Sequence, residues 1–129
     1  MIYLYVGIGG IIGSLARFLV GLIPIASSYP IQTFAINMIG SFILGFLTIY
    51  FKEKNVRQEI SAALGTGVIG SFTTLSTFSV DTLHLLQSGV YLEAFLYIAS
   101  SMVLGLLAAM CGMYTANKIY QNKARGERV

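Results

Sequence analysis

Four apolar stretches, each about as long as a membrane crossing, constrain this chain more than any other feature. They cover residues 2–23, 31–51, 60–86 and 91–115, and the links between them are short. A helix needs about 20 apolar residues to cross the hydrocarbon core of a bilayer. Lipid offers the backbone no hydrogen-bond partners, so each stretch must be helical. The sequence therefore predicts an all-α fold, with residues 1–129 forming one transmembrane domain of four helices.

The composition excludes an ordinary soluble domain. Of the 129 residues, 56% are hydrophobic and 10% are charged, whereas soluble domains carry about a quarter charged residues. The basic residues lie beside the ends of the apolar stretches, which indicates membrane orientation and lipid contact rather than nucleic-acid binding. The first stretch is too long for a cleavable signal peptide and contains Arg17. The single cysteine, Cys111, is expected to be buried and inert.

The distribution of Lys and Arg predicts a single orientation in the cell membrane. With four crossings, the N-terminus, the second link and the C-terminal tail share one side of the bilayer. The other two links carry no basic residue, so the opposite side holds one at most, if Arg17 is assigned there. Both termini are therefore expected in the cytoplasm. The shared side holds seven basic residues, namely Lys52, Lys54, Arg57, Lys118, Lys123, Arg125 and Arg128.

Small residues recur at four-residue spacing in three of the stretches. This spacing places them on one face of a helix, where they allow two backbones to approach closely. It predicts a tight helix bundle and carries no function by itself. The residues are Gly9 and Gly13, then Ala63, Gly67 and Ser71, and finally Ser101, Gly105 and Ala109.

The third stretch carries the strongest functional signal. Residues 65–79 combine three glycines with a series of Ser and Thr residues. Each glycine costs about 1 kcal/mol relative to alanine in a regular helix, and the hydroxyls of Thr73 and Thr74 can bond backbone groups that a break sets free. We predict two half-helices that meet around residues 70–74, an arrangement that lines ion sites in membrane proteins. The alternative is a continuous helix whose hydroxyls bond back to the preceding turn.

Polar residues also recur in the second and fourth stretches. Thr33, Asn37 and Ser41 share one helical face, and an amide in hydrocarbon requires a hydrogen bond, so Asn37 must meet another helix or water. Tyr97 and Ser101 lie one turn apart in the fourth stretch. With Thr33 and Asn37, these two residues predict a ladder of hydrogen-bond donors without a fixed negative charge, which suits a small anion.

The charged residues near the helix ends are less specific. Arg17 is expected to have a structural role or to line an aqueous vestibule. Asp81 and His84 are expected at the membrane interface rather than in a catalytic role.

Three motifs follow one another along nearly the whole chain. They are Gly9-Gly10-x-x-Gly13-x-x-x-Arg17-Phe18, Asn37-x-x-Gly40-Ser41-Phe42-x-x-Gly45 and Gly67-x-x-Gly70-Ser71-Phe72-Thr73-Thr74-Leu75-Ser76-Thr77-Phe78-Ser79. In this combination the chain resembles the Fluc/CrcB family of fluoride channels. The resemblance implies passive fluoride export, fluoride resistance, and an antiparallel dimer of four-helix subunits with two pores.

The resemblance also implies particular site residues. It implies a structural sodium ion at the dimer interface, held by the backbone carbonyls of Gly70 and Thr73 from each subunit. The chain departs from the family pattern at Leu75, where a phenylalanine is expected, and at Gly105, where a small polar residue is expected. By motif position, the fluoride pore falls on Thr33, Asn37, Leu75, Ser76, Thr77, Phe78, Tyr97 and Ser101.

The charge distribution and Leu75 together predict a non-identical partner. An antiparallel homodimer requires one sequence to insert both ways round, which a bias of seven basic residues against one opposes. We therefore expect a heterodimer with an antiparallel homologous subunit. In this dimer, the pore that depends on Leu75 is expected to conduct poorly or not at all.

Three other functions are weaker alternatives. A non-conducting assembly subunit accounts for the small-residue faces but not for the glycines and hydroxyls of the third stretch. A small proton-coupled multidrug exporter needs a carboxylate within the membrane, and the first stretch contains none. An enzyme is not expected, because no nucleophile–base pair or metal-ligand cluster is visible.

Overall fold

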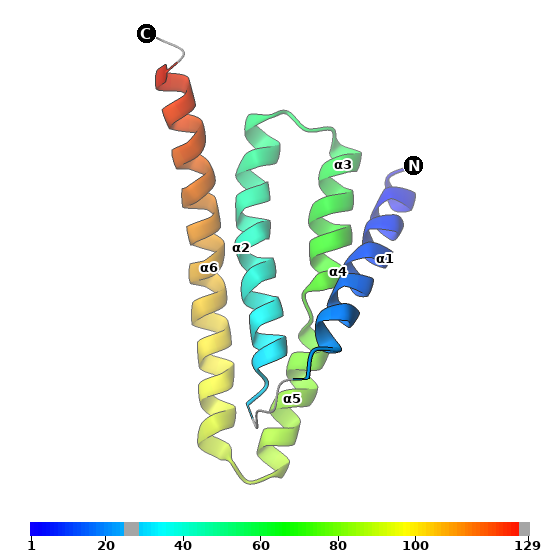
Figure 1. The fold of residues 1–129 in the computed structure, drawn as a ribbon, viewed down its shortest axis with the longest axis vertical. Coiled ribbons are helices and arrows are strands. Elements are labelled where there is room, and N and C mark those ends of the chain that lie inside the picture. The colour runs from blue at the N-terminus through cyan, green and yellow to red at the C-terminus, as the bar shows by residue number, and fades with distance from the viewer. Residues whose placement is uncertain (25–28, 127–129) are drawn as a thin grey trace.

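The computed structural model describes residues 1–24 and 29–126, and the regular structure within them is entirely helical (Figure 1). Three long helices are α1 (Ile2–Gly21), α2 (Ile31–Glu53) and α6 (Tyr91–Gly126). The segment between α2 and α6 is divided into the short helix α3 (Gln58–Ala62), the π-helix η1 (Ala63–Ile69), α4 (Gly70–Phe72) and α5 (Leu75–Gln87).

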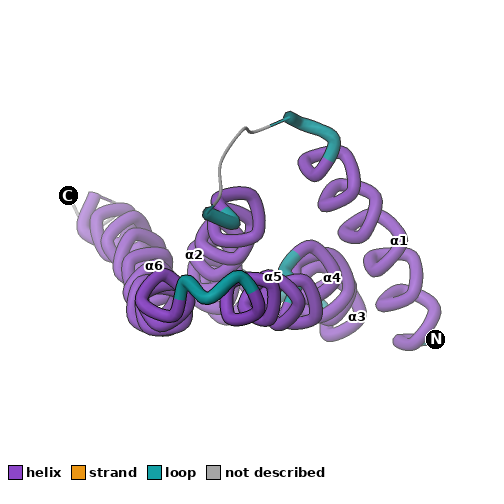
Figure 2. Tube along the Cα trace, turned by 90° about the horizontal axis from the view of Figure 1, so that it is seen from below, coloured by secondary structure: helices purple, strands orange, loops and turns teal. Residues whose placement is uncertain are grey.

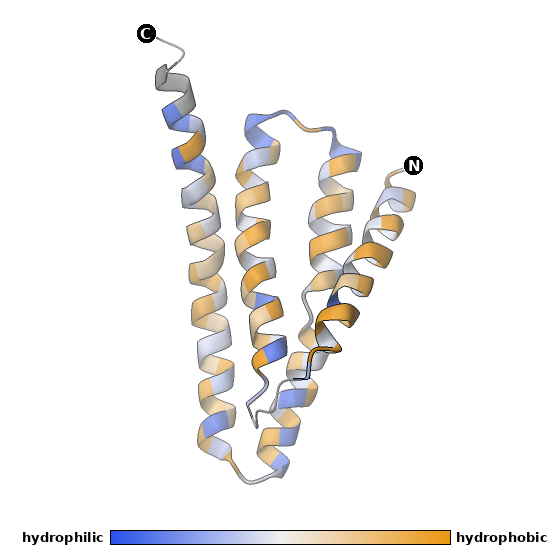
Figure 3. Ribbon diagram, viewed as in Figure 1, coloured by the Kyte–Doolittle hydropathy of each residue, from blue (hydrophilic) through white to orange (hydrophobic). Residues whose placement is uncertain are grey.

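Among the described residues, three helices are long and apolar enough to cross a membrane, namely α1, α2 and Tyr91–Asn122 of α6. In each, only 11–17% of the most hydrophobic window is buried inside the chain, and apolar residues dominate their middle portions (Figure 3). So much exposed apolar surface is that of an integral membrane protein. The predicted third crossing at 60–86 is made of the short pieces from α3 to α5.

The long helices end at different residues from those predicted. α1 ends at Gly21 rather than at residue 23, α2 continues to Glu53 rather than 51, and α6 continues to Gly126 rather than 115. Hydropathy marks the part of a helix that fits hydrocarbon, whereas the backbone of α2 and α6 stays helical beyond that part. The additional turns of α6 pack on the end of α2, where the Lys54 ammonium lies 5.7 Å from the centre of the Tyr120 ring.

The helices form a bundle in which α1 and α6 lie on opposite flanks, with α2 and the segment from α3 to α5 between them (Figure 2). α2 packs chiefly on α6, and α1 packs chiefly on η1. The start of α1, the link from α2 to α3 and the last turns of α6 lie at one end of the bundle (Figure 1). They therefore share one side, as the sequence predicted. That this side faces the cytoplasm stays a prediction.

Glycines make the closest contacts between these helices, as their spacing predicted. A Cβ atom on Gly9 or Gly13 of α1 would overlap a carbonyl oxygen of η1, and for Gly13 that oxygen belongs to Val68. On the other side of the bundle, a Cβ atom on Gly45 of α2 would overlap the Ala109 carbonyl of α6. Larger side chains would separate these backbones, so the bundle requires glycine at these positions.

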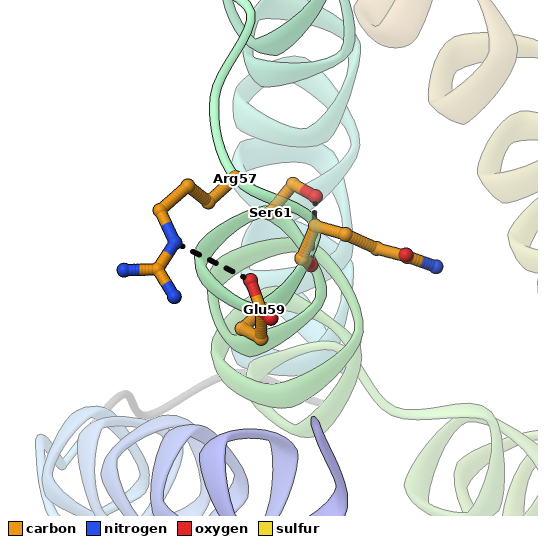
Figure 4. A network of polar contacts seen from close by, with 4 residues as sticks. Arg57, Glu59 and Ser61 are labelled. Carbon is orange, nitrogen blue, oxygen red and sulfur yellow. Dashed lines mark hydrogen bonds and ion pairs between the residues drawn. The ribbon is translucent and has the colours of Figure 1, made fainter. Parts of the chain in front are cut away.

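The segment that starts at α3 begins with a polar turn at the bundle end. The Arg57 Nε atom lies 3.6 Å from Glu59 Oε2, and the Ser61 hydroxyl donates a hydrogen bond of 3.0 Å to the Gln58 carbonyl (Figure 4). Because the Arg57 side chain is 75% exposed, this ion pair adds little stability. The helix then widens into η1, a π-helical turn that the sequence did not predict.

Cys111 is exposed on α6, so the prediction that it is buried is wrong. In a membrane protein, lipid-facing and buried positions are equally apolar, and hydropathy does not distinguish them.

Candidate functional site

The segment between α2 and α6 is broken at Thr73 and Thr74. α4 ends at Phe72 and α5 begins at Leu75. Both threonines have extended backbone conformations, with φ −69° and ψ 157° for Thr73 and φ −146° and ψ 122° for Thr74. The break lies within the predicted interval of residues 70–74, and the alternative of a continuous helix is wrong.

The Thr74 side chain caps the start of α5. Its hydroxyl accepts a hydrogen bond of 3.1 Å from the Thr77 N–H and donates one of 3.0 Å to the Thr77 hydroxyl. The Ser76 hydroxyl lies 3.2 Å from the same oxygen. A threonine cap of this kind stabilises a helix by about 1 kcal/mol. The hydroxyls of Ser76 and Thr77 thus contact the cap that begins α5.

Asn37 holds the break from α2. Its side-chain amide donates a hydrogen bond of 3.0 Å to the Thr74 carbonyl and accepts one of 2.8 Å from the Thr74 N–H. The sequence predicted that Asn37 meets another helix or water, and it meets the broken backbone. The amide replaces, at one residue, the two hydrogen bonds that a helix would have provided.

The break releases two backbone carbonyls that the resemblance had singled out. In a continuous helix, the N–H groups of Thr74 and Thr77 would bond the carbonyls of Gly70 and Thr73. Here the Thr74 N–H bonds Asn37, and the Thr77 N–H bonds the Thr74 hydroxyl. The Gly70 carbonyl accepts a long contact of 3.5 Å from the Thr73 hydroxyl. Both carbonyls are therefore available as oxygen ligands.

A groove of about 280 Å³ lies beside the break, between α2 and α6. We call it the Thr74 groove. The Leu75 side chain on its wall is 77% exposed, and the Ser101 oxygen is buried without a hydrogen-bond partner in the described part of the chain. Two further lining residues, Met38 and Met102, were not predicted from the sequence, because no polar or glycine pattern marks them. Four predicted pore residues line this groove, namely Asn37, Leu75, Phe78 and Ser101.

Tyr97 and Thr33 lie outside this groove, in a buried region. The Tyr97 ring has no exposed surface and packs against Tyr29 and Phe78, with ring centres 5.5 and 5.0 Å away. Its hydroxyl donates a hydrogen bond of 3.4 Å to Asp81 Oδ2 and lies beside the buried Thr33 side chain. We call Tyr29, Thr33, Asp81 and Tyr97 the Tyr97 cluster.

The prediction of a donor ladder without a fixed negative charge is wrong at the Tyr97 cluster. The half-buried Asp81 carboxylate accepts the hydrogen bond of the Tyr97 hydroxyl. The two residues are 16 positions apart, and only the packing of α5 on α6 brings them together. No pattern in the sequence signals this pairing. His84, one turn later, is exposed.

Arg17 lies on α1, apart from both polar regions. Its Nε atom is buried and has no hydrogen-bond partner within residues 1–24 and 29–126. A structural or vestibule role for this side chain stays a prediction.

Comparison with known proteins identifies the family. The pattern of the family described as CrcB-like protein, Camphor Resistance (CrcB), matches residues 4–113. This chain belongs to the CrcB family. The fluoride-specific ion channel FluC 2 of Listeria monocytogenes is 41% identical to this CrcB chain over 128 residues, which cover 98% of the chain and 97% of the relative.

Two further relatives are similar to this CrcB chain over most of its length. The fluoride-specific ion channel FluC 1 of Bacillus cereus is 42% identical over 116 residues, covering 87% of the chain and 85% of the relative. The fluoride-specific ion channel FluC of Oceanobacillus iheyensis is 47% identical over 116 residues, covering 88% and 89%. The CrcB family is thus the one that the three motifs indicated.

Proposed function

We propose that this chain is a subunit of a fluoride channel that carries fluoride passively out of the cell and so gives fluoride resistance. The observation that carries the proposal is the helix break at Thr73 and Thr74, which Asn37 holds beside a groove containing the unpaired Ser101 hydroxyl. Membership of the CrcB family and the names of its relatives identify fluoride as the proposed ion.

The proposed mechanism is the stepwise exchange of water for protein donors. Fluoride loses its hydration shell and meets hydroxyl groups, amide N–H groups and the positive edge of an aromatic ring. Weak, replaceable contacts keep its release fast, and a narrow path rejects larger chloride. Arg17 would attract anions from a vestibule. The proposed path follows the groove residues Asn37, Leu75, Phe78 and Ser101, with Ser76 and Thr77 beside the cap of α5.

In this proposal the segment from α3 to α5 crosses the membrane as the third of four crossings. Its broken centre pairs with the same region of an antiparallel second subunit. The carbonyls of Gly70 and Thr73 from each subunit suit a sodium ion, because the break has diverted their helical N–H partners. Such an ion would supply positive charge beside these carbonyls.

The second subunit is a homologue with the opposite orientation. The seven basic residues that the sequence assigns to one side of the membrane oppose insertion both ways round and favour cytoplasmic termini. The Leu75 side chain is exposed on the groove and has no aromatic edge, so the pore that it lines carries fluoride more slowly than a pore with phenylalanine at this position. The relatives numbered FluC 1 and FluC 2 fit organisms that make two such proteins.

The test is fluoride efflux from liposomes that contain this chain alone or this chain with the homologue encoded beside it. Efflux only with both subunits is the expected result. Efflux from the chain alone would replace the heterodimer with a homodimer and leave the channel intact. Absence of efflux from both preparations would contradict the channel and favour a non-conducting assembly subunit.

A further inference from the structure

The polar groups that line the Thr74 groove differ in whether they already form hydrogen bonds within the protein. Both polar atoms of the Asn37 amide bond the Thr74 backbone. The Thr74 hydroxyl caps α5, and the Thr73 hydroxyl donates to a carbonyl of the preceding turn at 3.0 Å. Ser41 and Ser101 remain, and neither hydroxyl has a hydrogen-bond partner among the described residues.

Ser41 is accessible because Gly105 faces it across the groove. A Cβ atom on Gly105 would lie 3.8 Å from the Ser41 oxygen and 3.4 Å from the terminal carbon of Met38. The absence of a side chain on α6 therefore leaves space beside the Ser41 hydroxyl. Ser101 lies one turn before Gly105 on the same helix, so the two serines line one groove from opposite helices, with the Ser101 oxygen buried within its wall.

The walls around these hydroxyls suit a small anion. The described residues that line the groove include no carboxylate, and the methionine, leucine and phenylalanine side chains among them are apolar. A donor in such surroundings binds an anion more strongly than it does in water.

We propose that Ser41 contacts the conducted anion, with Ser101 on the opposite wall of the groove. This inference rests on the proposed fluoride conduction and adds to it a residue outside the set that the sequence indicated. In it, the free Ser41 hydroxyl donates to the anion after the anion has lost water.

The test moves the hydroxyl from one wall of the groove to the other. Ser41→Ala removes it, and the double variant Ser41→Ala with Gly105→Ser returns a hydroxyl from α6, on a Cβ atom that would lie 3.8 Å from the position of the Ser41 oxygen. We expect Ser41→Ala to lower fluoride efflux from liposomes about tenfold, since a hydrogen bond to a charged group is lost, and the double variant to recover most of the rate. Thermal unfolding of both is expected to match that of the unaltered channel.

Two controls keep the outcomes distinct. Ser14→Ala changes an exposed serine of α1 away from the groove and should leave efflux unchanged. Ser41→Cys keeps the size of the side chain with a much weaker donor, and should lower efflux even if the alanine variant does not fold.

The results separate this inference from the proposed function. Efflux from the unaltered channel together with normal efflux from Ser41→Ala or Ser41→Cys would overturn the role of Ser41 and leave the channel proposal standing. A folded double variant that stays as slow as Ser41→Ala would also overturn it, in favour of a packing role. Absence of efflux from the unaltered channel would overturn both proposals.

Discussion

The Thr74 groove and the Tyr97 cluster are built from the same kinds of residues on the same helices, yet their hydroxyls differ in whether they form hydrogen bonds within the protein. In the cluster, the Tyr97 hydroxyl bonds Asp81, and the Tyr29 hydroxyl lies 3.3 Å from that of Ser100. In the groove, the hydroxyls of Ser41 and Ser101 have no partner in the described part of the chain.

This difference indicates separate roles for the two regions. A buried hydroxyl that is bonded within the protein contributes to the stability of the fold. A buried hydroxyl without a partner costs stability unless a ligand or water supplies the bond. The cluster is therefore expected to hold α5 against α6, and the groove is expected to exchange water for an anion. The variants below test this division, beginning with the largest expected effect.

Asn37→Leu should have the largest effect, because Asn37 holds the break next to the groove. The substitution removes both hydrogen bonds to Thr74 and leaves a backbone N–H and a carbonyl unpaired, at a cost of about 2–6 kcal/mol. Thermal unfolding in detergent and fluoride efflux would both be measured, and both should fall sharply. Asn37→Asp keeps the acceptor for the Thr74 N–H, so its stability and its efflux should lie between those of the unaltered chain and those of the Leu variant. A Leu variant as stable as the unaltered chain would contradict the role assigned to Asn37.

Ser101→Ala should separate conduction from stability. Its hydroxyl has no protein partner among the described residues, so unfolding should stay unchanged while efflux falls about tenfold for the loss of a charge-assisted hydrogen bond.

The neighbouring Ser100 is the matched control for this variant. Its hydroxyl lies 3.3 Å from that of Tyr29 and also donates to the Tyr97 carbonyl. Ser100→Ala should therefore cost about 1 kcal/mol of stability and leave efflux nearly unchanged. If the two serine variants exchanged these phenotypes, the division between groove and cluster would be wrong.

Tyr97→Phe should have a moderate effect. It removes the hydrogen bond to Asp81 and keeps the ring that packs on Phe78, so the expected cost is about 1 kcal/mol of unfolding free energy. Efflux should fall less than in Ser101→Ala. A larger fall in efflux than Ser101→Ala produces would place the main anion contact in the cluster.

Leu75→Phe should have the smallest effect on fluoride efflux, and it should raise efflux rather than lower it. The Leu75 side chain is 77% exposed on the groove, so a phenylalanine can be accommodated with little change in stability. Its ring edge should raise efflux about threefold. Leu75→Met, which adds bulk without a ring, is the control and should leave efflux unchanged. Equal rates from the unaltered and the Leu75→Phe channels would show that this position does not limit conduction.

The break and the glycine contacts could be predicted because their causes are local. Glycines such as Gly13 and Gly45 recur at helical spacing, and the hydroxyls of Thr73 and Thr74 stand where freed backbone needs partners. The need of Asn37 for a partner also follows from its place in an apolar helix.

The division of the polar residues into two regions could not be predicted. The sequence places Tyr97 and Ser101 one turn apart and suggests one continuous ladder. Which hydroxyl is free depends on contacts between distant segments, such as that of Tyr97 with Asp81 and the space that Gly105 leaves beside Ser41.

The most direct test of the central claim is the release of fluoride and chloride from the same liposomes, reconstituted with this chain and its neighbouring homologue. The account predicts rapid fluoride release with chloride retained, and fluoride release about tenfold slower in Ser101→Ala channels that unfold at the unaltered temperature. Equal release of both anions, or fluoride release that Ser101→Ala leaves unchanged, would contradict it.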